Sequence, residues 1–238
     1  METAITFGYY VSSLGFLIAS LIMGLALMKF GKSAIGTALT YFVIGTVTFF
    51  VVTIFQKLGA DSFGIADESM DIWWHLMFYL ALLSYYFGLK TLVGLGNGDA
   101  SAQSSRHGTV WGLFTAAALV LIFVIPSSVE PFVNIYTSSP PAILGLHHFL
   151  AFLLSAIVGW YLLSVKRDLG QIGRAIANPM IVGIWSLGGQ HFWELLFESW
   201  KWVDVTSEVG EGGEKIFLTI TAICVIYAAW RLKSFAQK

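Results

Sequence analysis

The sequence predicts an all-α, polytopic integral membrane protein, a bundle of seven transmembrane helices with the N-terminus outside and the C-terminus in the cytoplasm. Three observations lead to this prediction. Of the 238 residues, 57% are hydrophobic and 11% are charged, whereas about 25% of the residues of a soluble domain are charged. The charged residues are clustered, so that long stretches carry none. The lysine and arginine residues are also divided unequally between the segments that join these stretches.

Seven stretches have about the length and composition of a membrane-spanning helix, which needs roughly 20 apolar residues. Their approximate bounds are 5–29, 35–57, 71–95, 109–126, 142–165, 178–200 and 214–233. The first is expected to be a span and not a signal peptide, because no basic residue precedes it and no clear cleavage site follows it. The fourth is the shortest because Pro126 ends it, and Pro140 and Pro141 delay the fifth. We therefore expect residues 1–238 to form a single transmembrane domain.

The basic residues predict the orientation, because the cytoplasmic loops of membrane proteins carry an excess of lysine and arginine. With the N-terminus outside, the inner side holds Lys29, Lys32, Lys90, Arg106, Lys166, Arg167, Arg174, Arg231, Lys233 and Lys238. The outer side holds only Lys57, Lys201 and Lys215. Most acidic residues fall outside, namely Asp61, Asp67, Glu68, Asp71, Glu130, Asp204, Glu208, Glu211 and Glu214. An acidic outer rim would attract cations, although it also serves simply to keep the outer loops soluble.

The net charge and the single cysteine exclude several classes of function. A net charge of -1 argues against a nucleic-acid partner, because phosphate binding requires a basic surface. Cys224 is the only cysteine, so the chain cannot form an intrachain disulfide, a cysteine-based zinc site or an iron–sulfur cluster. The expected partner is the lipid bilayer, in the first place that of the plasma or cytoplasmic membrane. Another membrane protein and a second copy of the chain are further candidates.

Four of the five histidines fall in the outer halves of predicted spans. His75 lies about one turn inside the third span, and His191 lies about nine residues before the end of the sixth. His147 and His148 lie near the start of the fifth span, whereas His107 is expected in an inner loop. At about 1.5 Å per residue, the first four are roughly 6–14 Å below the outer boundary. Because ionisable side chains are costly in the membrane, this common depth favours a shared functional site.

Carboxylates accompany two of these histidines at helical spacing. Asp71 and His75 are four residues apart and His191 and Glu194 are three apart, so the members of each pair share a helix face. Glu198 lies one turn further along the second face. Helical bundles build metal sites from inward-pointing glutamate and histidine at this spacing, and such donors suit zinc, iron or copper. We therefore predict a metal or cofactor site between the third, fifth and sixth spans.

The predicted ligands are His75, His148 and His191, with Glu194 and Asp71 as further ligands or as hydrogen-bonding partners of the ligands. Glu198 is interpreted as an acid at the entrance to the site. Neighbours on a helix point about 100° apart, so only one of His147 and His148 can face the interior. We favour His148 because Gly145 lies on the same helix face. The prediction requires these side chains to lie within about 10 Å of one another, because metal–ligand bonds are only about 2 Å long.

Haem is the second candidate cofactor, since membrane b-type cytochromes hold haem between two histidines on different helices. Gly145, Gly188 and Gly189 could let a macrocycle approach the backbone, but such glycines also serve close helix packing. The site could be redox, sensory or hydrolytic, with Glu194 or Asp71 as a base in the last case. No HExxH or GxSxG motif supports a hydrolase, so the sequence does not decide whether the protein is an enzyme. A non-catalytic structural subunit of a membrane complex is the remaining alternative.

Overall fold

The computed structural model describes residues 2–31, 33–63, 67–96, 110–117, 145–167 and 169–236. Within these ranges the regular secondary structure is helical and no strand occurs, as predicted. The helices are α1 (Glu2–Phe30), α2 (Ala34–Phe63), α3 (Asp67–Gly96), α7 (Leu146–Val165), α8 (Gly170–Glu194), the short π-helix η3 (Leu195–Ser199) and α9 (Ser207–Ala236). Residues 110–117 are also helical.

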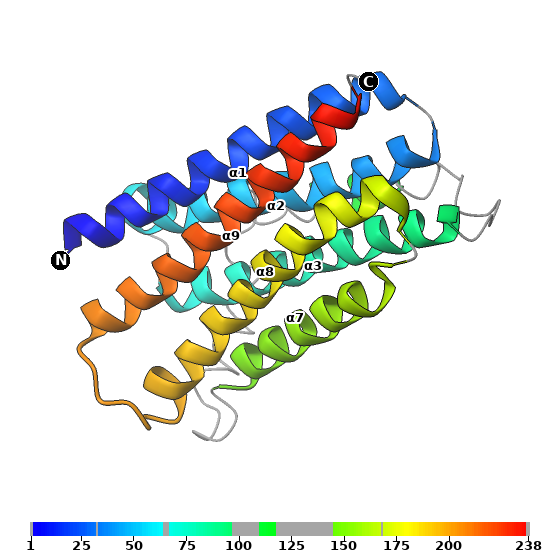
Figure 1. The fold of residues 1–238 in the computed structure, drawn as a ribbon. Coiled ribbons are helices and arrows are strands. Elements are labelled where there is room, and N and C mark those ends of the chain that lie inside the picture. Colours follow the sequence, from blue (N-terminus) through cyan, green and yellow to red (C-terminus); the bar gives the residue numbers. More distant parts are fainter. Residues whose placement is uncertain are drawn as a thin grey trace.

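The long helices run nearly side by side and form a closed ring (Figure 1). In order around the ring, α1 packs against α2, α2 against α3, α3 against α7, α7 against α8, α8 against α9, and α9 against α1. The helical segment 110–117 lies outside this ring on α2 and α3. There Trp111 donates a hydrogen bond to Ser84 (2.6 Å) and Gly112 faces Ile44. The contact between α3 and α7 closes the ring, and it brings together segments that are distant in the sequence.

Five of the described helices are long and apolar enough to cross a membrane: Ile5–Phe30, Ile35–Gln56, Trp73–Gly94, Leu146–Val165 and Ser207–Phe235. They correspond to predicted spans one, two, three, five and seven, and they indicate a helical, multi-pass membrane protein. The helix α8, which contains most of predicted span six, is not among them, because polar residues such as Asn178, Gln190 and His191 lower its mean hydropathy. Predicted span four lies outside the described residues except for 110–117.

Several helices extend beyond the predicted spans. The helix α8 begins at Gly170 and already includes Pro179, which lies next to the predicted start of span six. Similarly, α9 begins at Ser207, seven residues before predicted span seven. The prediction counted apolar residues, whereas a helix continues wherever its backbone hydrogen bonds are favourable. The hydrophobic stretch therefore marks the part of the helix suited to lipid, and the helix itself is longer.

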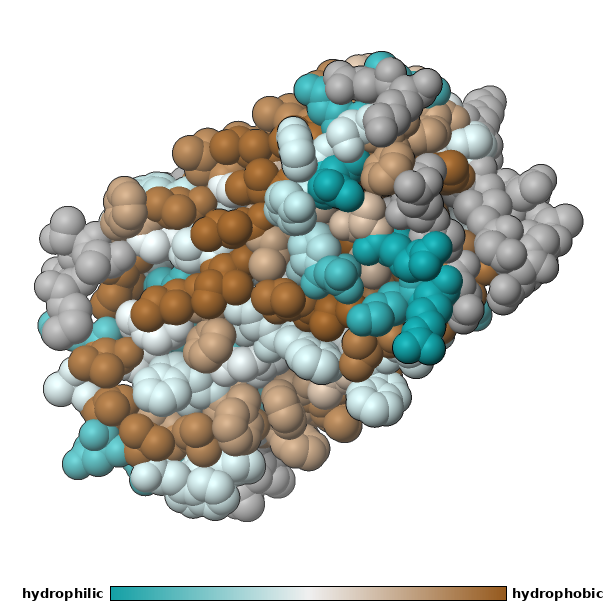
Figure 2. Space-filling model, in the orientation of Figure 1, coloured by the Kyte–Doolittle hydropathy of each residue, from teal (hydrophilic) through white to brown (hydrophobic). Residues whose placement is uncertain are grey.

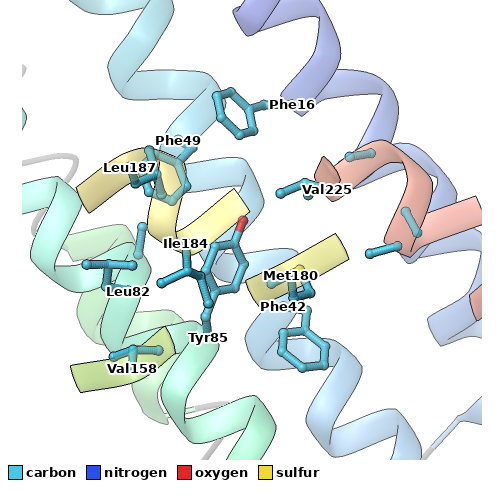
Figure 3. Packing of buried hydrophobic residues seen from close by; sticks show 14 of the residues in the cluster. Phe16, Phe42, Phe49, Leu82, Tyr85, Val158, Met180, Ile184, Leu187 and Val225 are labelled. Carbon is cyan, nitrogen blue, oxygen red and sulfur yellow. The ribbon is translucent and has the colours of Figure 1, made fainter. Parts of the chain in front are cut away.

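The interior of the ring is filled by large apolar side chains around Tyr85 of α3 (Figure 3). Every long helix contributes to this core, through residues such as Phe16, Phe42, Phe49, Leu82, Val158, Met180 and Val225. The hydroxyl of Thr46 donates to the carbonyl of Phe42 (2.7 Å), so the Tyr85 hydroxyl donates to Thr46 (3.1 Å). A Cβ atom at Gly45 would lie 2.9 Å from the ring of Tyr85. Glycine at this position therefore allows α2 and α3 to pack closely.

The outer surface of the ring carries large exposed apolar side chains, as expected for contact with lipid. Figure 2 shows apolar residues covering the middle of the bundle, with polar residues gathered toward its ends, among them the connection between α7 and α8. Exposed apolar residues include Leu14, Leu21 and Met28 of α1, Leu153, Ile157 and Trp160 of α7, and Ile216, Ile223 and Trp230 of α9. An apolar belt of this extent indicates contact with the lipid bilayer.

Candidate metal centre

Three helices of the ring bring three histidines and one glutamate together at one end of the bundle. His75 lies near the start of α3, His148 near the start of α7, and His191 and Glu194 at the end of α8. All four are buried, with exposed fractions between 0% and 4%. Each residue offers a ligand atom, and these four atoms lie within 4.8 Å of one another. This separation is well inside the limit of about 10 Å set by the metal-site hypothesis.

The four donor atoms form a continuous series of short contacts. Nε2 of His75 lies 3.1 Å from Nδ1 of His148. The same Nδ1 atom lies 2.8 Å from Oε2 of Glu194, and Oε2 lies 2.6 Å from Nδ1 of His191. One carboxylate oxygen and three imidazole nitrogens therefore converge on a small volume between α3, α7 and α8. We refer to these four residues as the His–Glu cluster.

Hydrogen bonds alone account poorly for the His–Glu cluster. An imidazole nitrogen has one in-plane direction, which carries either a proton or a lone pair. Nδ1 of His148 nevertheless contacts both His75 and Glu194. These two contacts cannot both be strong, linear hydrogen bonds. A cation at the point of convergence would use the lone pairs of all four atoms at once, and three imidazoles with one carboxylate are a common donor set for transition metals.

The spacing of the donors also suits an ion. In a tetrahedral site with metal–ligand bonds of about 2.1 Å, neighbouring donor atoms are about 3.4 Å apart. The three contacts of 2.6, 2.8 and 3.1 Å would each lengthen by less than about 1 Å, which changes in side-chain torsion angles can supply. Zinc, iron and copper all accept this combination of imidazole and carboxylate ligands.

Residues around the His–Glu cluster orient the glutamate and exclude water. Nε2 of Gln190, one turn before Glu194 on α8, donates to Oε1 of Glu194 (3.1 Å), which leaves Oε2 for the histidines. The ring of Phe78 on α3 lies edge-on to the ring of His191, with 4.3 Å between their centroids. Among the described residues, Nε2 of His191 has no hydrogen-bond partner. A metal ion bound here would thus be held in an apolar environment in which electrostatic attraction is strong.

His148, and not His147, faces the glutamate. His148 is 4% exposed and contacts Glu194, whereas His147 is partly exposed. The ring of His147 packs edge-on against His75 (4.3 Å between centroids), and its carbonyl accepts a hydrogen bond from Tyr79 (2.8 Å). The two rings lie side by side, with 3.9 Å between their centroids, but among the described contacts only the His148 ring reaches Glu194.

Glu198 lies at the edge of the cluster on the π-helix η3. Its Oε2 atom is 3.5 Å from Nε2 of His148, on the side of the ring opposite to Glu194, and 47% of its side chain is exposed. The amide of Trp200 bonds to the carbonyl of Leu195 (2.8 Å), which is the wide spacing of a π-helix. Single π-turns of this kind are frequently found at functional sites. Spacing in the sequence predicted the location of Glu198 but not the π-helix.

Asp71, the remaining predicted site residue, belongs to α3, but its side chain lies outside the described residues. Two other polar residues of α8, Gln190 and Ser186, have different roles. Gln190 joins the site through Glu194, as described above. The hydroxyl of Ser186 donates to the carbonyl of Phe217 on α9 (2.8 Å), so this residue links neighbouring helices.

The space beside each of the three glycines that favoured haem is filled by side chains of neighbouring helices. A Cβ atom at Gly145 would lie 2.7 Å from Ser199, one at Gly188 would lie 3.1 Å from Ser155, and one at Gly189 would lie 3.0 Å from Phe217. The histidine rings also contact one another directly, with centroids 4.7 Å apart for His75 and His148. A haem requires a flat slot between its two axial histidines. The haem hypothesis is not confirmed, and the packing favours an ion.

A second buried ionic cluster occupies the same end of the bundle. Nζ of Lys215 on α9 lies 3.1 Å from Oε2 of Glu214 and 4.0 Å from the ring centroid of Tyr9 on α1. Lys215 and Glu214 are 5% and 7% exposed. The sequence placed Lys215 at the outer edge of the last span, but α9 begins at Ser207 and both residues lie inside it. No spacing rule indicated this cluster, because it joins the first and last helices of the chain.

No protein-family model, no curated protein and no solved structure matches this chain.

Proposed function

We propose that this chain is a multi-pass membrane protein that binds one transition-metal ion through His75, His148, His191 and Glu194. One observation carries the proposal. Four buried ligand atoms from three helices lie within 4.8 Å of one another, and Nδ1 of His148 faces two of them, which one strong hydrogen bond does not satisfy. Buried polar groups are normally satisfied, so a cluster of this kind calls for a cation. Asp71, four residues before His75, is proposed as a further ligand or as the partner that orients the His75 ring.

The proposed topology has seven spans, with the N-terminus outside. In its favour, α7 ends and α8 begins at the same end of the bundle, and α8 packs along both α7 and α9. The helix α8 would therefore cross the same thickness of membrane as its neighbours, despite its lower mean hydropathy. Basic residues gather at that end, among them Lys29, Lys90, Lys166, Arg174 and Arg231, which is the pattern of a cytoplasmic side. The His–Glu cluster lies at the opposite end, and therefore in the outer leaflet of the plasma or cytoplasmic membrane.

The proposed ion is zinc, iron or copper, and its identity decides the role of the protein. Four protein donors complete a tetrahedral zinc site, which would stabilise the bundle or report zinc concentration. Iron or copper in the same site would add electron transfer. Haem b remains the second candidate cofactor, and a structural subunit without a cofactor is the third possibility.

The first experiment combines elemental analysis with one absorption spectrum of the protein purified in mild detergent. We expect about one zinc, iron or copper ion per chain, and none after His191→Ala or Glu194→Gln. Glu194→Gln is informative because glutamine keeps the shape of the side chain, removes its charge and replaces one ligand oxygen by an amide nitrogen. The matched control is His107→Ala, which removes a histidine predicted to lie in an inner loop, and it should retain the metal.

The other outcomes distinguish the alternatives. A Soret band would select haem and electron transfer. If neither metal nor haem is found, and zinc, iron and copper salts added to the purified protein do not bind, the metal proposal is wrong. The scaffold function would then take its place.

A further inference from the structure

We infer that Glu198 is the port through which a divalent transition-metal ion exchanges between the His–Glu cluster and the aqueous phase. The inference rests on the metal-binding function proposed above. It concerns the route of the ion and not the residues that hold it.

Exposure changes abruptly between Glu198 and the cluster. The four proposed ligands are 0–4% exposed, whereas 47% of the Glu198 side chain is exposed. Its carboxylate lies 3.5 Å from Nε2 of His148. Among the residues whose side chains the structure describes, Glu198 is the carboxylate that contacts both the cluster and solvent. An ion leaving water at this position would move from one oxygen ligand directly to the first imidazole.

The other described sides of the cluster carry no exposed carboxylate. Phe78 packs against His191, and Leu195, which follows Glu194, is 1% exposed. Tyr79 and His147 cover the side of His75, where the Tyr79 hydroxyl is engaged with the His147 carbonyl. An ion that crosses an apolar wall loses its hydration without compensation, at a cost of many kcal/mol. A carboxylate on the route offsets part of that loss.

The backbone around Glu198 suits a side chain that moves. Glu198 belongs to the π-helix η3. The hydrogen bonds of a π-helix join residues five apart, and this conformation is less favourable than an α-helix. Across from η3 lies Gly145, whose missing side chain leaves Ser199 room against the start of α7. This close contact keeps α7 packed against η3, while the Glu198 side chain, which is 47% exposed, has room to rotate between His148 and solvent.

A port differs from a residue that merely orients a ligand. By accepting a hydrogen bond from His148, Glu198 could hold that ring in position, and its loss would then speed release of the ion and weaken binding. A port lowers the barrier in both directions. Its loss slows binding and release together and leaves the dissociation constant nearly unchanged.

The test measures the kinetics of Co²⁺ binding to the detergent-purified full chain by stopped-flow absorption. Release is followed by adding a chelator. In Glu198→Gln we expect the association and dissociation rate constants each to fall about tenfold, with a dissociation constant within about threefold of wild type. The absorption spectrum of the saturated variant should equal that of wild type, which shows that the site itself is intact.

Two variants serve as controls. Glu208→Gln removes one exposed carboxylate from the start of α9 at the same end of the bundle, and its rate constants should stay within about twofold of wild type. Glu198→Asp keeps the charge and should recover most of the association rate.

Two results would overturn the inference, and a third would overturn the metal-binding function on which it rests. Unchanged rate constants in Glu198→Gln would show that the ion enters elsewhere. Faster release with unchanged association would assign Glu198 to orienting His148. An absence of Co²⁺ binding to the wild-type protein would instead contradict the metal-binding function itself, so the two failures are distinguishable.

Discussion

Two buried polar clusters lie at the same end of the bundle, and their buried polar groups are satisfied in different ways. In the first, Lys215 contacts Glu214 and the ring of Tyr9. In the second, His75, His148 and His191 surround Glu194 (donor atoms within 4.8 Å). Both lie in helices of an apolar bundle, and both consist of residues that are rarely buried without a partner.

The difference lies in the balance of donors and acceptors. The ammonium group of Lys215 brings three donors and a positive charge. The carboxylate of Glu214 supplies the acceptor and the opposite charge, so this cluster is complete without a ligand. The His–Glu cluster brings four possible metal-ligand atoms to one point, and one nitrogen faces two of the others, which a single strong hydrogen bond does not satisfy. Burial of charge does not by itself indicate a ligand site. The convergence of four ligand atoms from three helices does, because a metal ion could accept lone pairs from all four at once.

The largest effect is expected when the ion pair is broken. Lys215→Ala leaves Glu214 buried without its partner, which should lower the free energy of unfolding by about 3–5 kcal/mol. Thermal or denaturant unfolding in detergent measures this change. The double variant Glu214→Gln/Lys215→Met removes both charges and should recover most of the stability. Wild-type stability of Lys215→Ala would mean that the pair contributes nothing, and the comparison between the two clusters would fail.

A metal ion should stabilise the protein through the His–Glu cluster alone. At an ion concentration 100 times the dissociation constant, the free energy of unfolding should rise by about 2.7 kcal/mol. His191→Ala should abolish this increase, and the Glu214→Gln/Lys215→Met variant should keep it. The measurement is unfolding with and without the ion in all three proteins. An equal response of wild type and His191→Ala would place the binding of the ion elsewhere in the chain.

The smallest effect is expected at the contact between α7 and η3. In Gly145→Ala the new methyl group meets Ser199 at 2.7 Å, which should separate His148 from Glu198 and cost about 1–3 kcal/mol of stability. Metal affinity should fall a few-fold, as measured by competition with a chelator. Gly24→Ala is the matched control, because no described atom lies within 4 Å of the new Cβ. If the two variants behave alike, the packing at η3 does not support the cluster.

Much of the fold could be predicted from composition, because a long apolar stretch has few alternatives to a membrane-spanning helix. The prediction was weakest where polar residues interrupt the stretch, as at Asn178 and Gln190 of α8. The histidines of the cluster and Glu194 could be predicted from their common depth and from the three-residue spacing of His191 and Glu194. Gln190 and Phe78 could not be assigned roles, because their positions depend on the rotation of α8 and α3 about their own axes.

The sequence by itself determined that the chain is helical, that its helices suit a bilayer, and that ionisable side chains occur at one depth on three of them. These properties depend on local composition and spacing, which act within a single helix. Only the tertiary structure decided that α3, α7 and α8 are neighbours and that His148 rather than His147 faces Glu194. It also decided that Lys215 is buried with a partner of its own. Such facts depend on which helices meet and how each is rotated, and packing between distant segments sets both.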